Sequence, residues 1–131
     1  MNLVEWTAEY IDYLNYHKGG LISKKVEGTS INCEYEGKGN VTYVISDKLD
    51  ESSVSLVYDG KYVLVCLHNK KNVEIIAEHW EKLCINKDLK IIFVDIINNG
   101  QWAIIPYIHN KITEKGYVKK SLISLYSNFG K

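Results

Sequence analysis

The sequence predicts a single α/β domain, residues 1–131, in which helices flank a mixed β-sheet. Residues 3–17 and 118–129 carry apolar side chains at the spacing of amphipathic helices. Between them lie short segments rich in Val, Ile and Tyr, separated by glycine-containing turns, as β-strands are. Residues 62–67 are apolar at both alternating sets of positions, which indicates a central strand that is covered on both faces. Helices and strands in this arrangement are typical of α/β proteins.

The first third of the chain predicts one helix and one strand pair. The helix over residues 3–17 is expected to end at Gly19-Gly20. In residues 30–36 apolar and polar side chains alternate with the period of a half-buried strand. The glycine-rich residues 37–40 predict a turn, after which residues 40–46 return as the partner strand.

The middle of the chain predicts a hairpin followed by a helix. Residues 54–58 and 62–67 read as two strands joined across Asp59-Gly60, a dipeptide typical of tight hairpins. Residues 72–85 then have apolar side chains along one side of a helix, and Asn72 is a suitable residue to cap it.

The last third predicts two paired strands and a closing helix. Residues 89–97 form a second apolar run, and Asn99-Gly100 predicts the turn into residues 101–108. Because Pro106 cannot donate a hydrogen bond to a neighbouring strand, this last strand is expected at the edge of the sheet.

The charges exclude one class of function. The 16 basic residues, all of them lysine, balance 16 acidic ones. Arginine is the usual side chain for bidentate contacts with phosphates and guanine, whereas lysine acts as a point charge. A neutral chain without arginine is therefore a poor candidate for strong sequence-specific DNA binding.

The cysteines and the hydropathy bear on the compartment. Three cysteines without paired spacing indicate reduced thiols in the cytoplasm. No apolar run approaches the ~18 residues of a membrane span, and the N-terminus lacks the order of a secretory signal. We therefore expect a cytoplasmic protein without a membrane partner.

The order of elements resembles the core of the PD-(D/E)XK, or restriction-endonuclease-like, nucleases, and its pattern is similar to that of archaeal Holliday-junction resolvases. In that family a helix carries a glutamate, and a hairpin follows with aspartate at its start and Glu-x-Lys on its second strand. Here Ala8-Glu9 matches the helix motif, and residues 52–72 look like the hairpin. The resemblance implies a restriction-endonuclease-like fold with the order α-β-β-β-α-β, followed by a C-terminal strand and helix.

The departures from the family motif predict a lost activity. Ser53 stands where the resemblance places the aspartate, and Cys66 and His68 stand where it places Glu-x-Lys. In the family the carboxylates hold a divalent cation that activates water and stabilises charge on the phosphate. A hydroxyl, a soft thiol and a mostly uncharged imidazole are poor ligands for Mg²⁺, which prefers oxygen anions. With Glu9 as the one retained position, we expect no cofactor.

Three readings in which chemistry survives remain open. Acidic residues elsewhere could have replaced the missing ligands around Mg²⁺; the candidates are Glu34, Glu36, Asp47, Asp50 and Asp59. Cys66 and His68 could bind Zn²⁺ with His79 or Cys84, although a structural site needs four ligands. Cys33 or Cys66 could be a nucleophile.

Lysines near the C-terminus predict a binding surface. Residues 107–131 contain five lysines and one glutamate, with tyrosines between them. Such a segment could follow a nucleic-acid backbone and stack on bases, or be the solvated face of a helix. The predicted nucleic-acid-binding residues are Lys61, Lys70, Lys71, Lys111, Lys115, Lys119 and Lys120.

We therefore expect a catalytically degenerate protein of the nuclease fold that serves as a nucleic-acid-binding or assembly module. It would bind DNA or RNA weakly and salt-sensitively, and would form a homodimer or bind a protein partner. The alternatives are an active metal-dependent endonuclease with relocated carboxylates, a non-catalytic subunit resembling that of a tRNA-splicing endonuclease, and a purely protein-binding adaptor.

Overall fold

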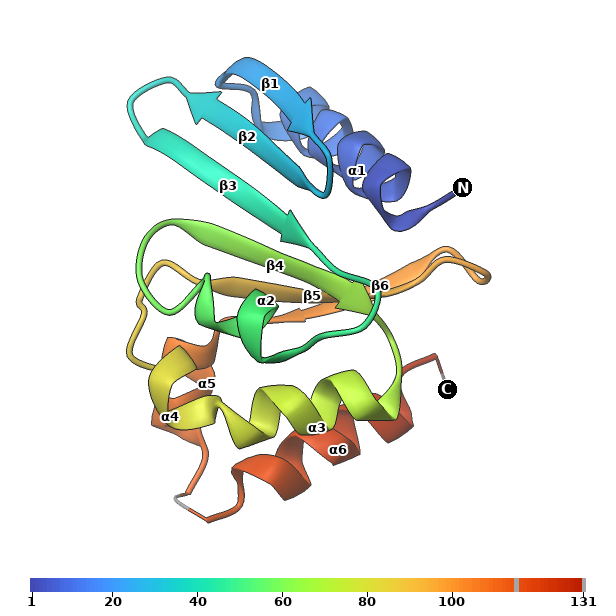
Figure 1. The fold of residues 1–131 in the computed structure, drawn as a ribbon, viewed down its shortest axis with the longest axis vertical. Helices are drawn as coiled ribbons and strands as arrows, with labels where there is room; N and C mark the ends of the chain where they lie inside the picture. Colours follow the sequence, from blue (N-terminus) through green and yellow to red (C-terminus); the bar gives the residue numbers. More distant parts are fainter. Residues whose placement is uncertain (115, 131) are drawn as a thin grey trace.

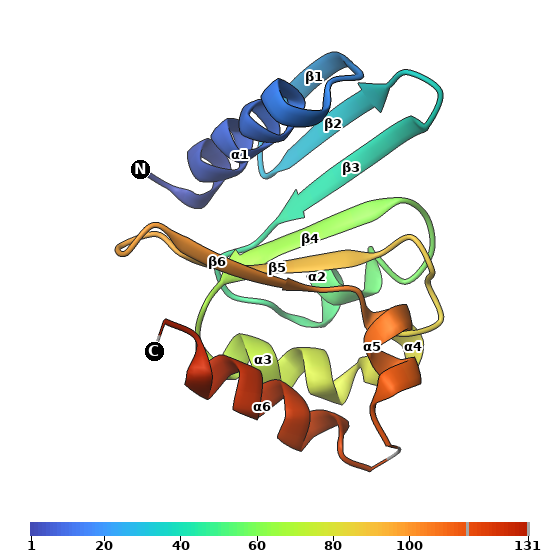
Figure 2. The same ribbon diagram turned by 180° about the vertical axis from the view of Figure 1, so that it is seen from behind.

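A six-stranded mixed sheet forms the centre of the computed structural model, which describes residues 1–114 and 116–130. Helix α1 packs on one face of the sheet, and helices α2, α3, α4 and α6 pack on the other (Figures 1 and 2). The elements are α1 (Leu3–Lys18), β1 (Leu21–Glu27), β2 (Ser30–Tyr35), β3 (Gly39–Ile45), α2 (Glu51–Ser55), β4 (Tyr62–Leu67), α3 (Lys70–Glu78), α4 (Trp80–Leu83), β5 (Lys90–Asp95), β6 (Gly100–Ile104), α5 (Pro106–Ile112) and α6 (Val118–Asn128).

The strands lie across the sheet in chain order, from β1 to β6. Strands β1, β2 and β3 form an antiparallel meander, strands β3, β4 and β5 are parallel, and β6 returns antiparallel to β5. Parallel neighbours need a long crossover connection. Residues 46–61 supply the first crossover, and residues 68–89 supply the second.

Helix α1 confirms the predicted N-terminal helix. Asn2 caps it, because its side chain accepts a hydrogen bond from the Glu5 N–H while the Glu5 carboxylate accepts one from the Asn2 N–H. Leu3, Trp6 and Ile11 are buried against the sheet. The helix ends at Gly19, whose φ of 71° suits a residue without a side chain.

Two strand predictions are also confirmed. Strands β2 and β3 pair as expected for residues 30–46, with Cys33 opposite Val41. Strand β4 is central, and residues 63–66 are buried. Strand β1 was not predicted, because its side chains are mostly exposed and lack a regular alternation of burial.

The predicted hairpin of residues 54–58 and 62–67 is wrong. The first of these segments lies in and after helix α2, and β4 pairs in parallel with β3. Asp59-Gly60 still forms a turn, with φ 109° at Gly60, but that turn leads from the helix into β4. A two-residue turn cannot join parallel neighbours, so the strand before β4 has to come from farther away in the chain.

A local cap explains why residues 51–55 are helical. The Asp50 carboxylate accepts a hydrogen bond from the Ser53 N–H at 2.8 Å, and the Ser53 hydroxyl accepts one from the Asp50 N–H at 3.0 Å. Val54 and Val57 are fully buried beneath this turn. The reciprocal cap and this burial outweigh the strand preference of the valines.

The predicted helix of residues 72–85 also needs correction. It begins earlier, at Lys70, and breaks at His79 into α3 and α4. Asn69 is the cap, since its side chain accepts a hydrogen bond from the Asn72 N–H at 2.8 Å. Asn72 itself lies inside the structure, where it is 1% exposed.

The edge position predicted from Pro106 is confirmed for β6, although the strand is shorter than expected. It ends at Ile104, and Pro106 opens helix α5, where its missing N–H costs no hydrogen bond. The predicted closing helix is confirmed as α6. None of the helices in the described residues has the length and apolar character that a membrane span needs.

Candidate nucleic-acid interface

The four positions expected from the nuclease motif do not lie together. Glu9 is exposed on α1, on one side of the sheet. Cys66 is fully buried in the apolar layer on the other side, beneath α3 and α6. Ser53 contributes its hydroxyl to the cap of α2. Burial raises the pKa of the Cys66 thiol well above its ordinary value, so Cys66 is a neutral core residue and a poor nucleophile.

His68 joins the end of β4 to the C-terminal helix. Its Nδ1 accepts a hydrogen bond from the Trp102 Nε1–H at 2.9 Å, which leaves the proton of the neutral ring on Nε2. The rings of Tyr126 and Phe129 lie 4.6 and 4.8 Å from the imidazole. Burial lowers the pKa of His68, and the charge of Asp95 opposes this shift. These contacts give His68 a structural role.

Metal-binding groups are not assembled in the part of the chain that the structure describes. Residues 1–114 and 116–130 contain no group of three or more His, Cys, Asp or Glu side chains that could hold one ion. His79, named as a zinc candidate, instead pairs its Nδ1 with the Tyr58 hydroxyl at 2.7 Å. The described residues therefore support neither a relocated carboxylate site nor a zinc site.

The lysines predicted to bind nucleic acid fall into separate groups. Lys70 and Lys71 open α3 at the carboxyl end of β4, whereas Lys61 precedes the amino end of the same strand. Helices α3 and α6 lie side by side and run in opposite directions (Figure 1), so Lys119 and Lys120 at the start of α6 lie far from Lys70 and Lys71. Lys111 is on α5, and Lys115 lies outside the described residues.

A set of lysines that shares Lys61 and Lys111 with the predicted set gathers at one end of the sheet. Because β3, β4 and β5 are parallel, their first residues lie at the same end of the sheet. The end of α1, the β2–β3 turn and α5 lie there too (Figures 1 and 2). The segments at this end are residues 18–20, 36–38, 56–61, 84–90 and 105–112. Their lysines, which we call the lysine rim, are Lys18, Lys38, Lys61, Lys87, Lys90 and Lys111.

The lysine rim is electrically unbalanced. Its six lysines face three acidic residues in the same segments, Glu36, Asp59 and Asp88, which leaves a net charge of +3 on a chain that is neutral overall. The ion pairs among the described residues are Lys24–Asp12 and Lys25–Glu27, and neither includes a rim lysine. The Lys61 ammonium donates to the Lys38 carbonyl oxygen at 2.7 Å, and the Lys90 ammonium donates to the Tyr10 hydroxyl at 3.4 Å. Because an ammonium has three N–H groups and no rim lysine is paired with a carboxylate among the described residues, the rim can still bind an external anion.

Tyrosines stand between the rim lysines. The Lys111 and Lys87 ammonium groups lie 4.2 and 5.6 Å from the centre of the Tyr107 ring. A hydrogen bond from Lys111, together with the charges of Lys111 and Lys87, lowers the pKa of Tyr107. Lys90 lies 5.9 Å from the centre of the Tyr10 ring. This interleaving of cations and aromatic rings is the pattern expected for residues 107–131. Lys111 and Tyr107 belong to that segment, whereas Lys87, Lys90 and Tyr10 lie outside it.

A groove with a volume of about 390 Å³ opens inside the lysine rim, and we call it the Tyr35 groove. It lies where the last turns of α1 meet the first residues of β3, β4 and β5. Its lining residues are Leu14, Asn15, Lys18, Gly19, Tyr35, Lys38, Val41, Tyr43, Val63, Asp88 and Lys90. Burial raises the pKa of Tyr35 and Tyr43, so both hydroxyls are neutral at physiological pH.

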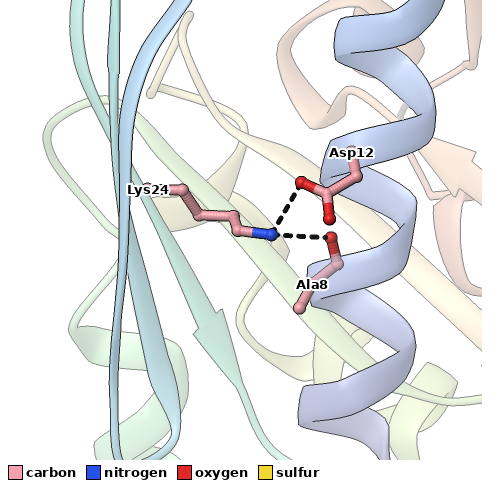
Figure 3. Close-up of polar contacts among 3 residues, drawn as sticks. All are labelled: Ala8, Asp12 and Lys24. Atoms are coloured by element: carbon pink, nitrogen blue, oxygen red, sulfur yellow. Dashed lines mark hydrogen bonds and ion pairs between the residues drawn. The ribbon is translucent and has the colours of Figure 1, made fainter.

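One wall of the Tyr35 groove is held in place by contacts between α1 and β1. The Lys24 ammonium lies 2.6 Å from the Asp12 carboxylate and 3.4 Å from the Ala8 carbonyl oxygen (Figure 3). Farther along α1, the Asn15 side-chain oxygen accepts a hydrogen bond from the Leu21 N–H at 3.1 Å. These contacts fix the end of α1 that borders the groove.

A sequence signal for the rim did exist. Lys38 and Lys61 come directly before β3 and β4, and Lys90 is the first residue of β5. Lysines at the starts of three successive strands meet only if those strands are parallel. The sequence predicts a hairpin before β4, so these lysines were not expected to lie together.

Comparisons of the chain with protein-family models, with curated proteins and with solved structures find no match.

Proposed function

We propose that this protein is a catalytically inactive module that binds nucleic acid through the lysine rim. The observation that carries the proposal is the gathering of six lysines, none of them in an ion pair among the described residues, at one end of a chain with no net charge. Phosphate groups are the anions that a line of separated ammonium groups with aromatic rings between them fits best.

The chemistry of the rim predicts how this binding behaves. Lysine contacts the backbone phosphates as a point charge, and the chain has no arginine to recognise base edges in a bidentate way. Binding should therefore tolerate any sequence and weaken steeply with salt. Because the chain as a whole has no net charge, the attraction for phosphates is confined to the end of the sheet that carries the lysine rim.

The order of elements supports kinship with the restriction-endonuclease-like nucleases. Helix α1, the three-stranded meander, helix α2 and the parallel strand β4 follow the order α-β-β-β-α-β that the resemblance implies. The hairpin of that core would then be formed by β2 and β3, and not by residues 52–72. Strand β3, with the sequence GNVTYVI, contains no acid and no lysine, so it offers no Glu-x-Lys motif.

The alternative with catalysis is an endonuclease that uses relocated carboxylates around Glu9 and Mg²⁺. It requires Glu9 and at least two other acids, or a carboxylate and His68, to converge, and residues 1–114 and 116–130 contain no group of three or more metal-binding side chains. A subunit of a splicing-endonuclease-like assembly and a protein-binding adaptor would share the fold without needing the lysine rim. The expected homodimer stays a prediction, which sedimentation velocity measures directly.

Charge reversal at matched positions tests the proposal. We expect Lys18→Glu, Lys38→Glu and Lys87→Glu together to abolish binding of labelled DNA and RNA, measured by fluorescence anisotropy at 50 mM salt. Each lost phosphate contact reduces the steepness of log affinity against log salt concentration by nearly one. The three single variants should therefore each reduce this steepness by one step. The control is Lys48→Glu, Lys70→Glu and Lys71→Glu, which changes the net charge equally at positions outside the rim.

The outcomes separate the candidate functions. Equal losses in both triple variants would contradict the lysine rim as the site, and no binding at any salt would favour the adaptor. Cleavage of any substrate with Mg²⁺ or Mn²⁺ that disappears in Glu9→Ala would establish the nuclease instead.

A further inference from the structure

We infer that the preferred ligand is single-stranded nucleic acid, with one unpaired base seated in the Tyr35 groove while neighbouring phosphates contact the lysine rim. This inference rests on the function proposed above and adds the class of nucleic acid to it.

The groove has the size and lining of a small-ligand site. Its volume of about 390 Å³ lies near the lower end of the ~300–1,000 Å³ that such sites occupy. Leu14, Val41 and Val63 contribute apolar surface, and Tyr35 and Tyr43 contribute aromatic rings. A flat base with polar edges suits a pocket in which apolar and aromatic surface surrounds a few polar groups.

The polar groups stand where a nucleotide needs them. The Lys18, Lys38 and Lys90 side chains line the groove and can reach the phosphates on either side of an inserted base. The Asn15 oxygen already accepts a hydrogen bond from the Leu21 N–H, so the group that Asn15 can offer a ligand is its amide N–H₂ donor. Base edges carry such acceptors, so Asn15 can hold a base without strong preference for its identity.

A duplex cannot use this groove without being opened. Its bases are paired and stacked inside the helix, so a duplex can reach the rim lysines only through its phosphates. Extruding a base from a duplex costs unpairing and unstacking energy, whereas a single strand offers its bases freely. The groove therefore adds affinity for single strands alone.

The decisive comparison uses the unaltered protein and two oligonucleotides of equal charge. One is a labelled single strand, and the other is the same strand with its bases replaced by abasic sites. Because both carry the same phosphates, we expect the abasic strand to bind about tenfold more weakly, the effect of losing one stacked base. A matched duplex carries about twice as many phosphates, so it is compared only with itself, in the groove variant described next. RNA should resemble DNA.

Two variants then locate the base in the groove. Val41→Trp fills the groove from β3, and we expect it to weaken single-strand binding about tenfold while leaving duplex binding unchanged. Tyr35→Phe keeps the ring, loses the hydroxyl and should bind normally. Circular dichroism checks the fold, and if Val41→Trp does not fold, the abasic comparison still decides.

The inference and the proposed function fail in different ways. No binding of any oligonucleotide at low salt would overturn the proposed function and the inference with it. Binding that is equal for normal and abasic strands would overturn the inference and leave the proposed function standing. Efficient competition by a nucleoside monophosphate would show a free-nucleotide site and would also overturn it.

Discussion

Lys24 of strand β1 and Asp12 of helix α1 form an ion pair with their nitrogen and oxygen atoms 2.6 Å apart (Figure 3). The Lys24 side chain is 23% exposed, while that of Asp12 is 62% exposed, so the pair is partly screened by water. It ties the edge strand to the helix that walls the Tyr35 groove.

The pair predicts a modest loss of stability when the charge is removed. We expect Lys24→Met to lower the free energy of unfolding by about 0.5–1 kcal/mol, since exposed pairs contribute little. Urea denaturation at low and high salt measures this loss, which should shrink at high salt. Lys25→Met is the control, because the Lys25–Glu27 pair at 3.2 Å is more exposed. An equal loss in both variants would contradict the importance of the α1–β1 tie.

The contacts of Asn72 predict a larger loss of stability when its side chain is truncated. Its side chain accepts a hydrogen bond from the Leu49 N–H at 2.9 Å and donates to the carbonyl oxygens of Asp47 and Leu67, both at 2.8 Å. Truncation leaves the buried Leu49 N–H and two partly buried carbonyl oxygens without this partner, so we expect Asn72→Ala to cost about 2–4 kcal/mol in thermal or urea unfolding.

The matched control for Asn72 is Asn69, the cap of the same helix. Asn69→Ala removes one cap hydrogen bond and should cost about 1 kcal/mol. If Asn72→Ala costs no more than Asn69→Ala, Asn72 does not hold the crossover between β3 and β4.

His68 predicts a stability that falls in acid. Its pKa is lowered from 6.5 in the folded protein, so the unfolded chain binds the proton more readily. The stabilisation by the neutral ring is therefore complete above pH 6.5 and is lost as the pH falls below that value, through the folded pKa. A protonated ring cannot accept the hydrogen bond from Trp102.

The measurement for His68 is the free energy of unfolding between pH 7.5 and 5. We expect His68→Phe, which keeps the contacts with Tyr126 and Phe129, to flatten this pH dependence by about 1 kcal/mol. His109, whose pKa burial also lowers, contributes to the slope that remains.

The cysteines predict an order of reactivity toward a thiol reagent such as dithionitrobenzoate. Cys33 and Cys66 are buried, whereas Cys84 is partly exposed. We expect one thiol to react in the native protein and three after denaturation. Rapid modification of Cys66 in the native state would contradict its burial beneath α3 and α6, and Cys66→Ala identifies its signal.

Local patterns predicted most individual elements. The amphipathic spacing of residues 3–17, the alternation around Cys33 and the apolar run of residues 62–67 each report how one segment is buried, and each corresponds to an element in the structure. The pattern failed for residues 54–58, because the cap formed by Asp50 and Ser53 decides the conformation there and residues such as Val54 suit a strand as well as a helix. It also named Asn72 as a cap, whereas Asn69 caps that helix.

The neutral charge and the all-lysine cation set are properties of the chain that no folding could change. The pairing of β3 with β4 was decided by the tertiary structure. Parallel neighbours are joined by a long crossover, and no local sequence pattern shows which strand lies at its other end. That pairing brings Lys38, Lys61 and Lys90 to the same end of the sheet. Strand direction thus converts scattered positive charges into a surface.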